Sequence, residues 1–146
     1  MRLRDLVHAH VLYDTIEVQL PCEPGFKFAL FRDLMGKTRE QTNFDVPIRL
    51  HVGEEFRLNS VVVKVSDEAL WGAANLTLMA DARPVLNRPL AHFKNPFMEY
   101  AKFMDNTDIR GHISIVHPVP GTGVATVRVE LHGTLVEPVP KDWKPE

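Results

Sequence analysis

The sequence predicts a mainly β protein, an antiparallel β-sandwich or β-barrel of about seven or eight strands with one short amphipathic helix at about 96–104. Apolar and polar residues alternate with a period of two in several segments, and prolines and glycines separate these segments. No rhythm of alternating strands and helices occurs. The size and composition predict a single domain over 1–146, with an exposed loop or arm at 37–45 and a proline-bearing tail at 139–146.

The clearest alternation lies in the segment 111–138. From 125 to 135 the odd positions are small or apolar and the even positions are polar, which is typical of a strand with one buried face. A shorter alternation at 112–115 precedes it, and the intervening 118–123 contains the prolines and glycines of a turn. We therefore expect a long β-hairpin whose apolar face is covered by the other segments.

The N-terminal part also alternates. Residues 7–13 carry apolar side chains at the odd positions and residues 16–20 at the even positions, which fits two strands or one long bent strand, and Pro21 and Pro24 end the pattern. The segment 25–36 suits a strand or a helix, and we favour a strand that runs into a turn. Residues 37–45 are polar without a period, so we expect an exposed loop or an arm that reaches a neighbour.

The middle of the chain predicts a second hairpin, with 61–65 opposite 76–80. The connection at 66–74 is long enough to hold one helical turn, capped by Ser66 or Asp67. This hairpin would add two further strands to the sheet.

Two Arg-Pro pairs follow, at 83–84 and 88–89, and they confine the chain to loop or edge-strand conformations. The best helix signal comes next, at 96–104. Asn95 can cap this helix, Pro96 suits its first position, and apolar side chains recur at helical spacing. One short helix is therefore expected to lie on a sheet.

The charges are nearly balanced, with 17 basic and 19 acidic residues, and both signs are spread along the chain. This balance argues against nucleic acid or an anionic membrane as the main partner. No apolar run has the length of a membrane span or of a signal peptide, and the single Cys22 fits a reducing compartment. We expect a cytoplasmic protein without a membrane partner, or assembly in the host cytoplasm for a viral protein.

Seven histidines are the most suggestive feature for a site. His8 and His10 are two residues apart, so their side chains share one face of the predicted strand and are the candidate metal ligands. His51 or His132 would have to complete such a site, because at least three converging ligands are needed. No further ligand spacing supports this, so we predict no metal and no other cofactor.

No catalytic motif of the GxSxG, CxxC or HExxH kind occurs, and we predict no catalytic residue. The neighbouring Asp105, Asp108, Arg110 and His112 would offer acid–base chemistry only if the fold gathered them in a pocket. His112 and His132 fall on the polar face of the predicted C-terminal hairpin. Cross-strand pairs there could titrate near neutral pH and serve a pH-dependent contact between subunits.

Two large apolar residues lie on predicted loops, Phe44 in the polar loop and Trp71 in the long connection, and we predict them as interface residues. These features favour a non-enzymatic structural or assembly subunit that forms a homo-oligomer or larger assembly, for example in a viral or phage particle. One alternative is a small-ligand-binding or metal-dependent β-barrel enzyme that uses His8 and His10. The other is an OB-like single-stranded nucleic-acid-binding protein that uses Trp71.

Overall fold

The computed structural model describes residues 5–31, 55–95, 97–103 and 107–138. These residues form eight strands and two short 3₁₀ helices. In chain order they are β1 (Asp5–Cys22), β2 (Lys27–Leu30), β3 (Glu55–Val65), η1 (Glu68–Gly72), β4 (Ala74–Ala80), β5 (Arg83–Pro89), η2 (Leu90–Phe93), β6 (Phe97–Phe103), β7 (Ile109–Ile115) and β8 (Val119–Pro138).

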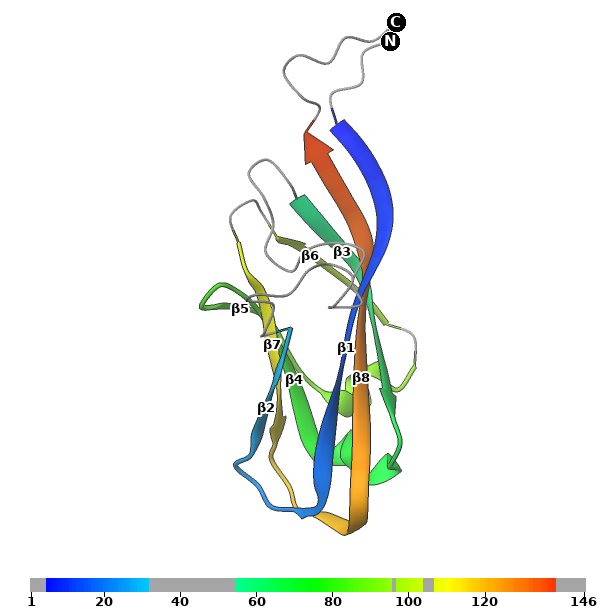
Figure 1. Ribbon diagram of the computed structural model, residues 1–146, viewed down its shortest axis with the longest axis vertical. Coiled ribbons are helices and arrows are strands. Elements are labelled where there is room, and N and C mark those ends of the chain that lie inside the picture. Colours follow the sequence, from blue (N-terminus) through cyan, green and yellow to red (C-terminus); the bar gives the residue numbers. More distant parts are fainter. Residues whose placement is uncertain (1–4, 32–54, 96, 104–106, 139–146) are drawn as a thin grey trace, which may run out of the picture.

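The described strands form two antiparallel four-stranded sheets (Figure 1). Sheet A has the order β1-β8-β3-β6, and sheet B has the order β2-β7-β4-β5. The two sheets lie face to face as a sandwich, which confirms the predicted mainly β fold and selects the sandwich rather than the barrel. Neither 3₁₀ helix of the described residues has the length and hydrophobicity of a membrane-spanning helix.

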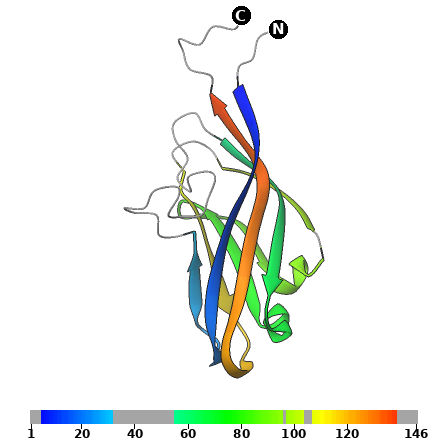
Figure 2. The same ribbon diagram turned by 45° about the vertical axis from the view of Figure 1, so that its right-hand side comes forward.

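Strands β1 and β8 form the longest ladder of the sandwich. The pairing runs from Asp5↔Pro138 to Cys22↔Val119, and the register shifts between Leu20 and Cys22. The two strands lie side by side over their whole length (Figure 2). The alternation at 7–20 thus belongs to one long strand, which is one of the two forms predicted for it.

Both predicted hairpins are wrong, although their strands are present. Strand β7 lies in sheet B and β8 in sheet A, and β3 and β4 are likewise in different sheets. In both cases the chain crosses from one sheet to the other. Alternation reveals which face of a strand is buried, but both sheets of a sandwich bury one face, so the pattern does not reveal the partner strand.

The segment predicted as the turn of the C-terminal hairpin is instead the first part of β8. Here the chain pairs with the end of β1, with Gly123 opposite Leu20 and Val119 opposite Cys22. Gly121 and Gly123 have positive φ angles of 126° and 85°, which glycine adopts without steric cost. The glycines therefore shape an irregular part of a strand and do not reverse the chain.

The predicted helix at 96–104 is also wrong, because residues 97–103 form β6, an edge strand of sheet A. Strand β6 pairs with β3 through Phe56↔Phe103 and Arg57↔Lys102. Its aromatic residues suit a strand as well as a helix, and so short a helix has little stability of its own. Pairing with β3 supplies the backbone hydrogen bonds that a lone helix would have to make internally.

The smaller predicted elements are confirmed. The connection between β3 and β4 holds η1, and the Asp67 carboxylate caps it by accepting a hydrogen bond from Ala69 N at 2.9 Å. Strand β5, which contains both Arg-Pro pairs, is an edge strand of sheet B. Strand β2 ends before a bend at Phe31, with φ of 56°, and residues 32–36 of the predicted turn lie outside the described residues. The predicted loop or arm at 37–45 and the tail at 139–146 lie outside the described residues.

The core fills the space between the two sheets. It consists of the apolar side chains on the inward-facing sides of the described strands. The largest fully buried side chains are Phe56, Phe103, Leu12, Leu30, Leu58, Leu70, Leu76, Leu78, Leu90, Ile109 and Ile113.

Gly133 allows the closest approach within sheet A. A Cβ atom added there would lie 2.3 Å from the carbonyl oxygen of Arg57 and 2.7 Å from Cζ of Phe56. The Phe56 ring in turn packs against Phe103, with 6.3 Å between the ring centroids. A side chain at position 133 would therefore force the backbone of β3 and this aromatic pair to move.

We predict that Gly133→Ala lowers the free energy of unfolding by about 2 to 3 kcal/mol because of this overpacking. The melting temperature should fall by roughly 5 to 10 °C, measured by thermal denaturation monitored by circular dichroism. Gly72→Ala is the matched control, because an added Cβ there meets no atom within 4 Å. Equal stability of the two variants would contradict the prediction.

Candidate functional site

Charged residues gather on the outer face of sheet A, and the first group surrounds Glu130. Lys64 on β3 lies directly opposite Arg128 on β8, an arrangement in which like charges repel. The Glu130 carboxylate joins them: its Oε2 atom lies 2.8 Å from Arg128 Nε and 3.5 Å from Lys64 Nζ. Its Oε1 atom lies 2.9 Å from His132 Nε2. We call these four residues the Glu130 cluster.

Tyr13 covers the Glu130 cluster from the side of β1. It lies opposite Glu130 in the ladder, and the Arg128 guanidinium carbon stands 4.1 Å from the centre of its ring, a cation–π contact. Glu130 is thereby only 9% exposed although it lies on an outer face. The hydrogen bond from Arg128 lowers the pKa of Glu130 to about 2, helped by His132 and Lys64 and opposed by burial.

A second group, the Glu55 cluster, repeats this arrangement across β3 and β6. Arg57 and Lys102 are directly opposite each other, and the Glu55 carboxylate lies between them. One of its oxygens accepts a hydrogen bond from Arg57 Nε, and the other lies 3.8 Å from Lys102 Nζ. The Glu55 side chain is 13% exposed, whereas those of Arg57 and Lys102 are 51% and 63% exposed. The cluster therefore presents its cations to solvent.

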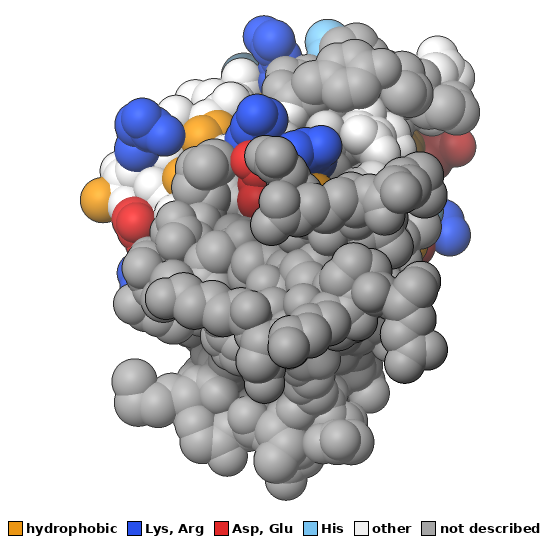
Figure 3. Space-filling view, turned by 90° about the horizontal axis from the view of Figure 1, so that it is seen from above, with side chains coloured by type: hydrophobic (Ala, Val, Ile, Leu, Met, Phe, Trp, Pro, Cys, Tyr) orange, Lys and Arg blue, Asp and Glu red, His pale blue; other side chains and the backbone are white. Residues whose placement is uncertain are grey.

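A shallow cavity of about 400 Å³ adjoins the Glu55 cluster and is lined by Arg57, Leu58, Asn59, Ala101 and Lys102. Relative to β8, strand β3 contains one extra residue between Leu58 and Ser60, so Asn59 is a β-bulge. We call this space the bulge cavity. Figure 3 views the molecule from above. Among the described residues on this side, Lys and Arg side chains lie close to acidic ones.

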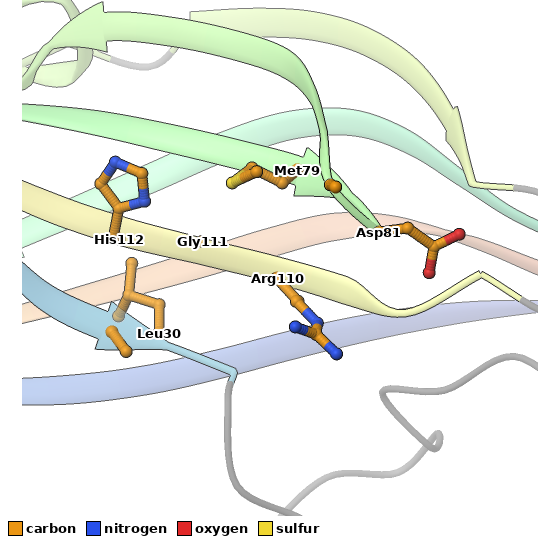
Figure 4. A pocket seen from close by; sticks show the side chains of 8 residues that line it. Leu30, Met79, Asp81, Arg110, Gly111 and His112 are labelled. Carbon is orange, nitrogen blue, oxygen red and sulfur yellow. The ribbon is translucent and has the colours of Figure 1, made fainter.

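A second cavity, of about 530 Å³, lies at the edge of sheet B and is lined in part by Met79, Asp81, Arg110 and His112 (Figure 4). Burial lowers the pKa of His112, and the positive charge of Lys27 lowers it further. The His112 ring and the Arg110 guanidinium extend to opposite sides of β7 in Figure 4. These side chains do not converge on one point of the cavity.

The acid–base group considered from the sequence is only partly assembled. Arg110 Nη2 binds Asp108 Oδ2 at 3.0 Å, and Asp81 Oδ1 accepts a hydrogen bond from Asp108 N at 2.9 Å. The latter contact joins the turn after β4 to the start of β7. Asp105 lies outside the described residues. Asp108 and Arg110 thus form an ion pair at the end of a strand.

The histidines predicted as metal ligands are spread over the chain. His8 and His10 lie on β1 opposite Leu135 and Gly133, and their side chains are outside the described part, as is all of His51. His132 contacts Glu130 instead. In the part of the chain that the structure describes, no three His, Cys, Asp or Glu side chains are placed to hold a metal ion. His112 and His132 belong to different sheets and are not cross-strand neighbours.

The two predicted interface residues differ in what the structure describes. Phe44 lies outside the described residues. Trp71 lies in η1, where its half-buried side chain packs against the core. Its role at an interface remains a prediction. Cys22 is buried, and this burial, together with the negative charge of Glu23, raises the pKa of its thiol, which makes it a poor nucleophile.

Lys64 and the Glu55 cluster were not predicted from the sequence. The only local signal is the pair Glu55 and Arg57, two residues apart on one strand, because Lys64 lies beyond the bulge and Lys102 lies on β6. The clusters exist because β3 pairs with β6 on one side and β8 on the other, which the sequence pattern does not reveal.

No protein-family model, no curated protein and no solved structure matches this chain. The function must therefore be inferred from the residues described above. Among them, the outer face of sheet A has the most organised polar chemistry, in the Glu130 and Glu55 clusters.

We predict that Glu130→Gln lowers the free energy of unfolding by about 2 kcal/mol at pH 7, because Lys64 and Arg128 then face each other without a carboxylate. The pKa of Glu130 is lowered by folding from 4.5 to about 2, so its stabilising contribution is complete above pH 4.5 and is lost between 4.5 and about 2. The difference between wild type and variant should therefore shrink as the pH falls through this range. Urea unfolding at pH 7, 4 and 2.5 measures it.

Glu17→Gln is the control for this prediction, because Glu17 is exposed and forms no ion pair with a described residue. It should leave the stability unchanged at every pH. A constant difference between wild type and Glu130→Gln from pH 7 to pH 2.5 would contradict the assigned role of Glu130.

Proposed function

We propose that this protein is a non-enzymatic structural subunit that self-associates into a homo-oligomer or larger assembly, such as a viral or phage particle. The observation that carries the proposal is the length of β1. It is an edge strand of sheet A with 18 residues, whereas strands in globular proteins are most often about 5 or 6 residues long. A long edge offers unpaired backbone N–H and C=O groups to another strand.

The first half of β1 is the part best suited to such pairing. Asp14 is bound to the end of β2: its Oδ2 atom accepts a hydrogen bond from Phe31 N at 2.9 Å. Before Asp14, β8 is the sheet neighbour of β1 among the described strands. Residues 5–13 are therefore the segment through which we expect a second copy to add to sheet A.

The chemistry of the described side chains supports a structural role as well. Glu55 and Glu130 on the outer face of sheet A are engaged with cations, and the cavity at the edge of sheet B does not gather its titratable groups. Cys22 is a free, buried thiol, in keeping with the reducing cytoplasm as the place of assembly.

The test is the mass of the purified protein in solution, measured by light scattering over a range of concentrations, with bound metal analysed on the same sample. We expect a metal-free mass that rises with concentration to a multiple of 16.6 kDa. A monomer at every concentration would contradict the proposal. Stoichiometric zinc, iron or manganese would instead favour the metal-dependent enzyme that uses His8 and His10.

A substitution on the edge strand tests the proposed route of association. Val11 is half-buried on the outer face of β1, opposite His132, and a lysine on an edge strand discourages pairing with another chain. Val11→Lys should raise the concentration needed for association by about tenfold or more. Thr126→Lys places the same side chain on the same face of the central strand β8, next to Glu17, and should have no such effect.

A further inference from the structure

We propose that the bulge cavity binds a carboxylate, and that in the assembly this carboxylate is the side chain of Glu68 from a second copy of the chain. The inference rests on the proposed self-association and names the groups that direct it. The proposed contact joins one end of a molecule to the opposite end of its neighbour.

The charge of the Glu55 cluster determines what the bulge cavity accepts. Arg57 and Lys102 carry two positive charges and Glu55 one negative charge, so the cluster has a net charge of +1. One added carboxylate makes it neutral, whereas a dianion such as phosphate would bring excess negative charge next to Glu55. The ligand that matches the cavity is therefore a single carboxylate.

The donors of the cavity rim are available to such a ligand. Arg57 uses Nε for Glu55, and its two Nη groups have no hydrogen-bond partner among the described residues. Lys102 Nζ lies 3.8 Å from Glu55, which leaves its ammonium group largely to solvent. Charge-assisted hydrogen bonds from these groups to an incoming carboxylate are stronger than neutral ones.

Glu68 is the carboxylate that we propose for this site, because it is exposed, has no partner among the described residues of its own chain and lies beside apolar side chains. It is exposed in the first turn of η1 and makes no hydrogen bond or ion pair with a described residue, whereas its neighbour Asp67 is used as the cap of that helix. Lys94, at the end of the adjacent η2, forms no ion pair with it. Ala69 is exposed and Trp71 half-buried beside Glu68, so its docking would also bury apolar surface.

The two sites lie at opposite ends of β3. Arg57 is near the start of this strand, η1 follows its last residue Val65, and the eight residue steps from Arg57 to Val65 span about 26 Å. In Figure 1, η1 lies at the lower end of sheet A and the start of β3 at its upper end. Glu68 therefore cannot reach the bulge cavity of its own chain. The contact is head-to-tail, which generates rings or filaments.

Charge reversal tests this pairing. We expect Glu68→Lys alone, and Lys102→Glu alone, each to raise the concentration needed for association by about tenfold or more in light scattering. An equimolar mixture of the two variants should associate as the wild type does, because each reversed charge then meets an opposite charge on its neighbour. The double variant should also regain association on its own.

Two matched controls reverse exposed charges that have no part in the contact. Glu23→Lys changes an acidic residue in the turn between β1 and β2, and Lys27→Glu changes an exposed basic residue on β2 of sheet B. Both should associate as the wild type does. Circular dichroism of every variant establishes that it is folded, and Lys102→Gln, which removes the charge without reversing it, should give an intermediate weakening.

The possible outcomes separate this inference from the proposed function. Association of the wild type together with unchanged association of both single variants would overturn the inference and leave the proposed function in place. Weakened single variants that are not rescued by mixing would also overturn it, because the two charges would then not be partners. A wild type that stays monomeric would overturn both.

Discussion

The pairing of β8 with β1 and β3 is the constraint on which the rest of sheet A depends. Strand β8 is 20 residues long and lies inside the sheet, hydrogen-bonded to β1 on one side and to β3 on the other. Its odd positions, such as Val127, Val129 and Leu131, are buried in the core, and its even positions carry Arg128, Glu130 and His132 on the outer face. One strand therefore positions the core and the most organised polar cluster. Because β1 lies near the other end of the chain and β3 in its middle, this pairing requires long-range contacts to form.

On the outer face of sheet A, a carboxylate offsets the repulsion between two facing cations at two separate places. Lys64 faces Arg128, and Arg57 faces Lys102, and each like-charged pair is joined by a carboxylate on the same face. Exposed ion pairs stabilise a protein only weakly, but the carboxylate here also removes a repulsion that the strand register would otherwise impose. Each cluster keeps a surplus of positive charge after this compensation. We propose that this surplus attracts a negative group from a second molecule.

Two features of different kinds support the proposed assembly. Backbone groups along the long edge of β1 can pair with another strand, but backbone pairing alone does not specify the orientation of the second copy. The surplus charge beside the bulge cavity, and the exposed Glu68 at the other end of β3, add direction. Edge pairing would supply affinity, and the charges would select the head-to-tail arrangement.

The local features of this protein could be predicted from its sequence. Period-two alternation predicted β1, β3, β4 and β8, the prolines limited β5 to a loop or an edge strand, and Ser66 or Asp67 was expected to cap η1, since each of these signals acts between near neighbours in the chain. The pairing of the strands could not be predicted in this way. The tertiary structure placed β7 and β8 in different sheets, made residues 97–103 a strand of sheet A, and brought Lys102 opposite Arg57. Backbone hydrogen bonds between strands are the same for every sequence, so the partner is chosen by the packing of the whole core, and with it the charged clusters that depend on that choice.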